Sequence, residues 1–400
     1  MKDYEKESIQ PKKQSIKLSA NYSFSSSIFY QNVFRIFYLF HLFYILVIEF
    51  PDNRFHSGNA ARLGNWWANK IGAEKLPATD GGGAEKVVAV LDTGVRLTHK
   101  ALKIWKTTEN YRIESGGSRF FCGGRGFNHR PGGDDFNYPD DRNGHGTRVA
   151  GIIAASGEKI KGVCPRATIL PVKTLNDANG LGCVGFIADG IRSVIYAKEK
   201  LGVGVRVVNI SGGMSGVIST IKLNDLKAAI KAAERAGILI VASAGNAGSD
   251  IGERKNRHYP ASIEADNLIA VAATDADDRK LTRSNYLESA LAAPGDKIET
   301  LGLSGENSIL SDTSAAAALV SGAAALLFSH FPALSCAELK SALLETGEDA
   351  SGRLKEHLPR GRLNVFGAYQ KIMRNQKQAA RSDKNAVGFN AGNLTDGGNI

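Results

Sequence analysis

The sequence has few cysteines, and none has the spacing of a zinc site. Its 400 residues include Cys122, Cys164, Cys183 and Cys336, but no CxxC pair. Structural zinc sites are usually built from such pairs. We therefore expect no metal site, and no other feature of the chain predicts a cofactor. Four cysteines allow three pairings into two disulfides, or none, so the redox compartment stays open.

The chain also lacks a concentrated basic surface. Its net charge is +10, but about half of the excess lies at its two ends. Residues 1–20 hold five Lys against three acidic residues, and residues 371–400 hold five Lys or Arg against two Asp. No basic face is interleaved with aromatic residues, so we expect no nucleic-acid partner.

A long apolar run occurs near the N-terminus. Residues 1–27 are polar and rich in Lys and Ser, whereas residues 28–50 are largely aromatic and aliphatic. Gln31, Asn32 and Arg35 shorten the apolar part, and no small-residue cleavage site follows it. An uncleaved membrane anchor, a signal peptide, and a buried helix or misassigned start all remain open. We expect residues 1–56 to be a polar N-terminal segment whose stretch 28–50 contacts a membrane or directs export.

Strands and helices alternate from residue 86 onward. Continuous apolar runs predict strands that are buried on both faces, and longer periodic segments predict helices. The expected strands are 87–92, 167–175, 205–211, 238–246 and 267–275, and the expected helices are 145–156, 186–200, 221–237, 313–331 and 336–347. This alternation predicts a three-layer αβα fold with a mostly parallel central sheet. Active sites in such folds lie beyond the carboxyl ends of the strands.

Three short segments carry residue types that work together in nucleophilic catalysis. Asp92 closes a buried strand in AVLDTG, His145 opens a helix in NGHGT, and Ser314 opens a small-residue helix in DTSAA. Alone, each residue fits an ordinary cap or turn. Together they form a nucleophile, a base that accepts its proton, and a carboxylate that orients the base. No GxSxG motif is present, which argues against an α/β-hydrolase.

The three segments follow one another in the order Asp, His, Ser, and the chain resembles the subtilases over roughly residues 60–370. The resemblance rests on VAVLDTGV, NGHGTRVAGIIAA and SDTSAAAALVSGAAALL, and on VASAGNAG and further matches between them. It implies a subtilisin-like fold and a serine endopeptidase with the triad Asp92, His145 and Ser314. It also implies an oxyanion hole made by the Asn246 side chain and the Ser314 backbone N–H.

The resemblance also implies a substrate cleft. In this family an extended peptide binds as a strand between two backbone edges, here Gly180, Leu181 and Gly182 on one side and Ser211, Gly212 and Gly213 on the other. Gly213, Gly245 and His258 would line the pocket for the residue before the scissile bond. Family members often have Gly at the position of His258, so we expect a shallower pocket.

Some residues depart from the family pattern. Asp312 replaces a Gly two residues before the serine, and Ala101 replaces an Asp that binds calcium in many members. A Gly at 312 would permit a positive φ, and a carboxylate there would oppose the oxyanion and favour protonated His145. Asp140 and Asp141 precede His145 and could favour basic substrates, form a solvated loop or bind a cation weakly.

Two functions therefore remain. The first is an active endopeptidase on residues 57–370, acting on proteins or peptides, followed by a polar tail without regular structure at 371–400. The alternative is a catalytically impaired subtilase homologue that binds extended peptides, favoured by Asp312 and by the absence of a recognisable prodomain upstream. We expect the protein to be secreted or membrane-anchored, with its catalytic domain outside the cytoplasm.

Overall fold

The structure is a computed structural model that describes residues 66–77, 87–107, 110–115, 118–123, 126–129, 139–165, 167–180 and 182–392. For 110–115, 118–123 and 382–392 it describes the backbone only. The chain divides into two compact units, Met1–Arg62 and Leu63–Ile400, and every described residue belongs to the second. The predicted segment 1–56, with its apolar stretch 28–50, lies outside the described residues.

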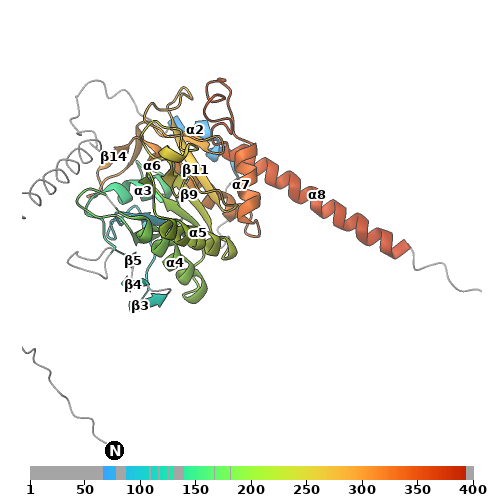
Figure 1. Cartoon of the computed structure of the whole chain (residues 1–400). Helices are drawn as coiled ribbons and strands as arrows, with labels where there is room; N and C mark the ends of the chain where they lie inside the picture. Colours follow the sequence, from blue (N-terminus) through green and yellow to red (C-terminus); the bar gives the residue numbers. More distant parts are fainter. Residues whose placement is uncertain are drawn as a thin grey trace, which may run out of the picture. The chain divides into compact units, whose positions relative to one another are not determined.

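A mostly parallel sheet forms the centre of the described unit (Figure 1). Its strands run in the order β12-β11-β9-β7-β1-β6-β5-β4-β3, with β2 beside β6. The pairs from β12 to β5 are parallel, whereas β3 and β4 form antiparallel pairs. The strands are β1 Val87–Asp92, β2 Lys103–Ile104, β3 Asn110–Ser115, β4 Ser118–Gly123, β5 Phe127–Asn128, β6 Thr168–Lys173, β7 Val205–Ile210, β9 Leu239–Ser243, β11 Leu268–Thr274 and β12 Leu291–Pro294.

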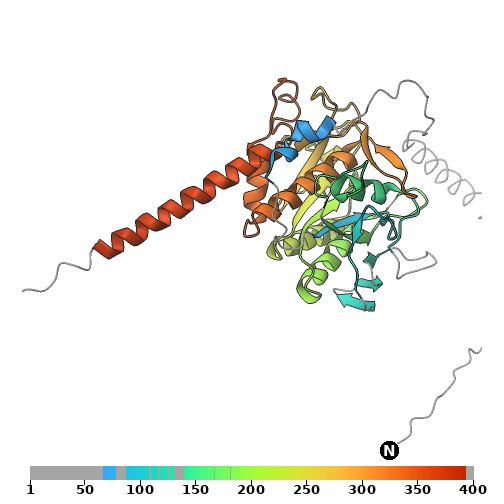
Figure 2. The same cartoon turned by 180° about the vertical axis from the view of Figure 1, so that it is seen from behind.

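Helices cover both faces of the sheet (Figures 1 and 2). They are α3 His145–Ala154 and α6 Thr313–His330 on one face, and α4 Val184–Lys200 and α5 Thr220–Arg235 on the other. Strand β1 shows why both faces must be covered. Its Val88 and Val90 pack in the core with α3 and α6, whereas Val87, Ala89 and Leu91 pack in the core with α4 and α5. This arrangement confirms the predicted three-layer α/β fold.

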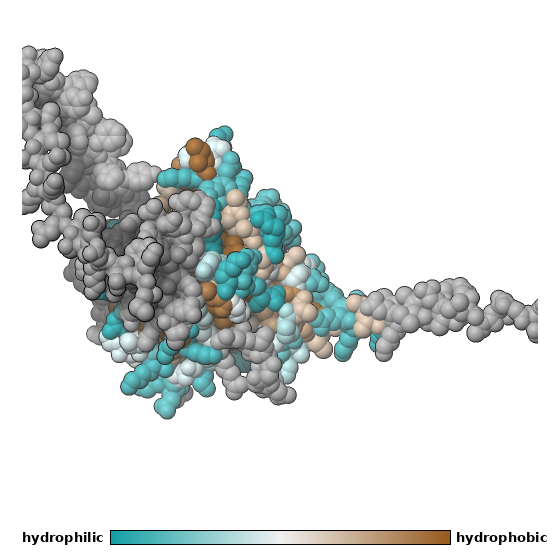
Figure 3. Space-filling view, turned by 90° about the horizontal axis from the view of Figure 1, so that it is seen from below, coloured by the Kyte–Doolittle hydropathy of each residue, from teal (hydrophilic) through white to brown (hydrophobic). Residues whose placement is uncertain are grey.

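Smaller elements complete the unit. They are α2 Trp66–Ile71, η1 Ala73–Lys75, η2 Arg254–Asn256, α7 Cys336–Glu345, α8 Val365–Gly392, and the antiparallel pairs β8 Met214–Ser215 with β10 His258–Tyr259 and β13 Ile298–Leu301 with β14 Asn307–Leu310. On the face drawn in Figure 3, most of the described surface is hydrophilic and the hydrophobic patches are small and separate. Among the described residues, most large apolar side chains are buried in the core, and Met214, Val217 and Ile221 are exposed.

Helix α6 runs through the middle of its layer. Small side chains let it pack closely, and Ala315 to Ala318 are completely buried. Among the described residues, α6 is also the one helix long and apolar enough to cross a membrane, but 89% of that window is buried inside the protein. Its hydrophobicity is therefore explained by its position in the core of the fold.

The end of the chain differs from the prediction. Residues 371–400 were expected to lack regular structure, but α8 continues from Val365 to Gly392. The first turns are anchored, because Val365, Ala368 and Ile372 are buried. Beyond them the sequence is polar yet rich in good helix formers such as Lys, Gln, Arg and Ala, which carry the helix onward (Figure 1). The prediction weighed polarity and missed helix propensity.

The contact between β1 and α3 leaves no room for a side chain at Gly146. A Cβ there would lie 2.0 Å from the carbonyl oxygen of Gly94 and 3.0 Å from the Cβ of Asp92. We expect Gly146→Ala to lower the free energy of unfolding by about 1–3 kcal/mol, because backbone must move to admit the methyl group. Chemical denaturation of the purified protein measures this.

The matched control is Gly185→Ala in the first turn of α4, where the nearest atom to the added Cβ is 3.7 Å away. That substitution should leave stability unchanged or raise it by about 0.5–1 kcal/mol, since Ala favours a helix more than Gly does. Equal stability of the two variants would contradict the close packing at Gly146.

Candidate functional site

Asp92 and His145 meet at the carboxyl end of β1. Asp92 is the last residue of that strand and is completely buried, and His145 is the first residue of α3. The Nδ1 of His145 lies 2.8 Å from the Oδ1 of Asp92, which also accepts a hydrogen bond of 2.7 Å from the N–H of Thr93. A carboxylate on Nδ1 favours the neutral tautomer whose Nε2 is free to accept a proton.

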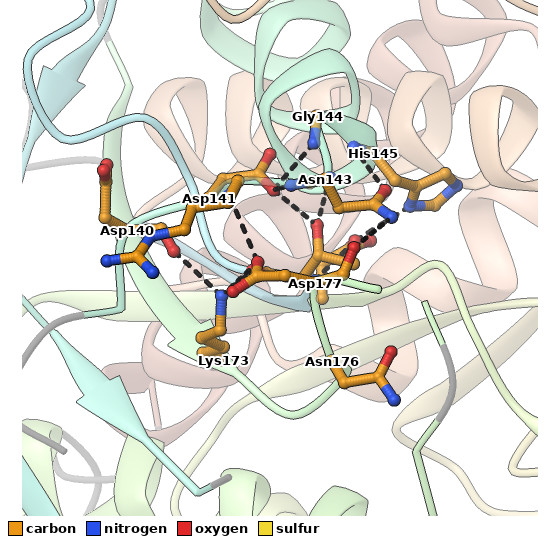
Figure 4. Close-up of polar contacts among 12 residues, drawn as sticks. Asp140, Asp141, Asn143, Gly144, His145, Lys173, Asn176 and Asp177 are labelled. Atoms are coloured by element: carbon orange, nitrogen blue, oxygen red, sulfur yellow. Dashed lines mark hydrogen bonds and ion pairs between the residues drawn. The ribbon is translucent and has the colours of Figure 1, made fainter. Parts of the chain in front are cut away.

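A buried carboxylate fixes the loop that carries His145. Asp141 is completely buried, and both of its carboxylate oxygens accept hydrogen bonds (Figure 4). Its donors are the Thr93 hydroxyl at 2.9 Å, the N–H groups of Asn143 at 3.0 Å, Gly144 at 2.8 Å and Thr147 at 2.9 Å, and the Thr147 hydroxyl at 2.6 Å. Asp141 thus ties the residue after Asp92 to those on both sides of His145.

The carboxylates of Asp140 and Asp141 are both engaged by donors within the protein. Asp141 has no exposed surface with which to meet a substrate. The carboxylate of Asp140 pairs with the Arg96 guanidinium at 3.0 Å and accepts from the N–H of Leu97 at 2.9 Å. These contacts argue against the suggestion that the two carboxylates select basic substrate residues.

A buried lysine at the end of β6 also binds the segment that precedes His145. The ammonium group of Lys173 donates to the carbonyls of Thr93 at 2.7 Å and Asp140 at 2.9 Å, and to the carboxylate of Asp177 at 2.6 Å (Figure 4). Only 7% of its side chain is exposed. Sequence reasoning missed Lys173 because its position at the end of an apolar strand does not reveal its hydrogen-bond partners.

Ser314 lies in the first turn of α6. Its side chain is buried, and its hydroxyl donates to the carbonyl of Ser211 at 3.2 Å. The hydroxyl of Ser211 in turn donates to the carbonyl of Ser314 at 3.2 Å. The candidate nucleophile thus lies directly beside the 211–213 segment, one of the two edges expected to bind substrate.

Asn246 is held beside the same helix end. Its Oδ1 accepts from the N–H of Thr313 at 3.2 Å and from the Thr313 hydroxyl at 2.8 Å. Because Oδ1 faces these donors, the amide nitrogen is directed away from them and can donate elsewhere. This orientation suits an oxyanion donor.

The second expected oxyanion donor is already engaged. The Oδ1 of Asp312 accepts from the N–H of Ser314 at 2.7 Å and from that of Ala315 at 3.3 Å, so Asp312 is the N-cap of α6. Its backbone is extended, with φ 161° and ψ −166°. The replacement of Gly by Asp therefore places a carboxylate on the expected oxyanion donor, and the extended backbone at 312 does not require a glycine.

Charges around His145 favour its protonated form. Burial opposes that charge, but the charge and hydrogen bond of Asp92, together with Asp312, outweigh burial and the opposing charge of Arg148. The pKa of His145 is raised to about 9. Burial also raises the pKa of Asp312, against the opposing effects of His145 and of the N–H groups at the start of α6.

The residues expected to bind substrate lie in two groups. A Cβ on Gly182 would lie 2.6 Å from Leu175 and one on Gly212 would lie 3.0 Å from it, so both expected edges flank this side chain. Leu181 lies outside the described residues, and Gly180 adopts a left-handed conformation with φ 66°.

His258 lies close to Gly213 and Gly245, the two glycines expected to line the pocket with it. A Cβ on Gly213 would lie 2.4 Å from its Nε2, and one on Gly245 would lie 3.0 Å from its ring. The Nδ1 of His258 lies 2.9 Å from the Ser215 hydroxyl, and burial lowers its pKa to about 4, so the ring is neutral. The three residues lie together, and their role as a pocket stays a prediction.

A second histidine–serine contact is structural. The Nε2 of His129 lies 3.2 Å from the Ser193 hydroxyl, which is itself completely buried in α4 and donates to the carbonyl of Gly190 at 2.8 Å. Burial lowers the pKa of His129 to about 3. A serine enclosed in this way cannot meet a peptide bond.

Comparison with known proteins agrees with this geometry. The chain is 33% identical to subtilisin DY of Bacillus licheniformis over 304 residues, which cover 75% of this chain and 96% of that protein. It is 36% identical to the major intracellular serine protease of Bacillus subtilis over 247 residues, covering 61% of this chain and 68% of that one.

Solved structures agree as well. A cold-adapted subtilisin-like serine proteinase aligns with a TM-score of 0.54 and 26% identity, covering 75% of this chain and 97% of the other. The sequence profile of the subtilase family matches residues 83–379, a range that includes Asp92, His145, Asn246 and Ser314. The chain therefore belongs to the subtilase family of serine peptidases.

Proposed function

We propose that Ser314, His145 and Asp92 carry out the peptide-bond hydrolysis of this subtilase. The observation that carries the proposal is the 2.8 Å hydrogen bond between Asp92 and His145 at the end of β1, near Ser314, which bonds to the residue that follows the neighbouring strand β7. A hydroxyl is a weak nucleophile at neutral pH and needs a base of this kind. The substrates are proteins or peptides, in keeping with the family.

The chemistry runs through an acyl-enzyme. The Ser314 hydroxyl turns from the Ser211 carbonyl toward His145, gives its proton to Nε2, and its oxygen bonds to the substrate carbonyl carbon. The carbonyl π electrons move to oxygen and form the oxyanion. His145 then returns the proton to the amine as the C–N bond breaks. Water then gives a proton to the same imidazole and bonds to the acyl carbon, and His145 passes that proton to the Ser314 oxygen as the ester bond breaks.

The oxyanion is stabilised by Asn246 and by the N-terminus of α6. The amide nitrogen of Asn246 supplies one hydrogen bond because its oxygen is already held by Thr313. The Ser314 N–H supplies the other when Asp312 is not bound to it. Asn246, fixed in advance by Thr313, costs no reorganisation as charge develops, whereas the Ser314 N–H must first be released by Asp312.

Substrate binds as an added strand between the segments 180–182 and 211–213. This placement is supported by the contacts of Gly182 and Gly212 on either side of Leu175. Main-chain hydrogen bonds would give affinity that tolerates many sequences. His258 would limit the depth of the neighbouring pocket and so favour shorter side chains before the scissile bond.

One observation favours the second candidate, a subtilase homologue that binds peptides without efficient cleavage. The Asp312 carboxylate engages the Ser314 N–H that the oxyanion needs. The ordered Asp92–His145 pair supports the active enzyme, because a peptide-binding module does not require it.

The location of the protein stays a prediction. Residues 28–50, the proposed membrane contact or export segment, are largely apolar in sequence. Export would place the catalytic domain, proposed at residues 57–370, outside the cytoplasm.

The nucleophile can be tested directly. We expect Ser314→Ala to lower kcat by several orders of magnitude and to leave only the residual rate of a dismantled triad, because the hydroxyl that forms the acyl-enzyme is removed. Hydrolysis of a chromogenic peptide by the purified variant measures this, and mapping of a fluorophosphonate label locates the nucleophile. Turnover equal to that of the parent protein would overturn the assignment.

Asn246→Leu tests the oxyanion donor. The substitution removes the amide nitrogen and should reduce kcat by about 10²–10³, with KM nearly unchanged, since the bond forms with charge that is absent from bound substrate. Steady-state kinetics separate the two constants. A change limited to KM would mean that Asn246 shapes the cleft only.

The raised pKa of His145 predicts an alkaline enzyme. Only the neutral imidazole can accept the serine proton, so kcat/KM should rise with pH and level off above about pH 9. Rate measurements from pH 5 to pH 11 would define this limb. A plateau already reached near pH 7 would show that His145 loses its proton at a lower pH than the raised pKa predicts, and would contradict the effect of the neighbouring carboxylates.

A further inference from the structure

Asp312 occupies a special position at the start of α6. Its carboxylate oxygen Oδ1 lies 2.7 Å from the backbone nitrogen of Ser314, the backbone donor proposed for the oxyanion. The N–H groups in the first turn of a helix, together with the helix dipole, form an anion-binding position. In this structure the anion that fills it comes from the protein itself.

We propose that Asp312 restrains catalysis by occupying, in the resting enzyme, the position that the oxyanion of the reaction must take. This inference rests on the proposed function, because it requires Ser314 to be the nucleophile. Turnover then begins when the substrate carbonyl oxygen displaces the carboxylate from the Ser314 N–H. Asp312 is not needed for any bond that forms or breaks.

The same carboxylate acts on the base. Asp92 from β1, Asp312 at the start of α6 and Arg148 from α3 are the charged groups that act on His145, and Asp312 adds to the effect of Asp92. Protonated His145 in turn stabilises the ionised Asp312. Below the pKa of His145, the resting site is therefore inactive in two ways, since the base carries a proton and the backbone oxyanion donor is occupied.

An ordinary structural role must be separated from this one. Asp is among the best N-cap residues, and losing such a cap costs about 0.5–2 kcal/mol of stability. Asn caps a helix about as well as Asp but carries no charge. Gly removes the side chain and costs only a few tenths of a kcal/mol at an N-cap. The two substitutions therefore distinguish capping from restraint.

The experiment compares Asp312→Gly and Asp312→Asn with the parent protein. The control is Asp266→Asn, which removes the same charge from an exposed carboxylate between β9 and β11. Thermal melting first shows that each variant is folded. For each protein we would measure kcat and KM across pH, and the Ki values of two inhibitors. These are a tripeptide boronic acid, whose adduct with serine places an oxygen in the oxyanion hole, and the same tripeptide as a carboxamide.

Restraint predicts a specific pattern. Asp312→Gly should raise kcat about tenfold or more, toward the factor of about 10²–10³ that one oxyanion donor provides. It should lower the Ki of the boronic acid by a similar factor and leave the Ki of the carboxamide unchanged. The acidic limb of kcat/KM should move to lower pH, because one of the carboxylates that hold the proton on His145 is gone. In kcat, boronic-acid Ki and the position of the acidic limb, Asp312→Asn should lie between Asp312→Gly and the parent. Asp266→Asn should match the parent in all three.

Three results would overturn the inference. If the folded Asp312 variants match the parent in kcat, boronic-acid affinity and pH limb, Asp312 is a helix cap only. If Asp312→Gly is folded but slower, the carboxylate assists catalysis. If neither the parent nor Asp312→Gly is labelled at Ser314 by a fluorophosphonate, the proposed function fails as well. Labelling of Ser314 thus separates the failure of the inference from the failure of the function.

Discussion

The arrangement of the site depends on one buried carboxylate, that of Asp141. A buried charge is costly unless donors surround it, and here five hydrogen bonds from four residues satisfy both oxygens. Those donors come from Thr93, which follows Asp92, and from residues on both sides of His145. Asp141 therefore helps to fix the distance between two members of the proposed triad, through hydrogen bonds to residues next to them in the chain.

The start of α6 is used for two opposite purposes. Helix capping favours a carboxylate beside the first N–H groups, and an oxyanion hole requires one of the same groups to be free for substrate. In this chain the two demands fall on the N–H of Ser314, which Asp312 occupies. A Gly at 312 would leave that N–H open at little cost to the helix.

The sequence predicted those parts of the fold that follow from long apolar patterns. Strand β1 and helices α3 and α6 begin at the predicted residues, because each carries a continuous or periodic apolar run. It did not predict β12, which is four residues long, or the β3–β4 pair, whose sequences NYRIES and SRFFCG are not continuously apolar. The expectation that residues 371–400 lack regular structure was wrong for residues 371–392, which continue helix α8. The anchored first turns and the good helix formers beyond them outweighed the polarity of the sequence.

The candidate site shows the same division. Asp92, His145, Asn246 and Ser314 were predicted from local motifs, and the structure places them at one sheet edge. Their roles stay predictions. Asp141 and Lys173 were not recognised as supports, because a hydrogen-bond network joins segments that are far apart in the sequence. Asp312 was noticed as a departure, but only the structure reveals its hydrogen bond to the Ser314 N–H.

Two carboxylates act on His145 with different consequences. Asp92 is completely buried and bonded to Nδ1, so its charge also fixes the tautomer and the orientation that a base requires. Asp312 raises the pKa of His145 through its charge alone, whereas Asp92 also contributes a hydrogen bond. Asp312 therefore favours the proton on the ring and does not orient it. Catalysis needs a base that is oriented and yet can lose its proton. The interaction with Asp92 provides the orientation, and the interaction with Asp312 opposes the loss of the proton.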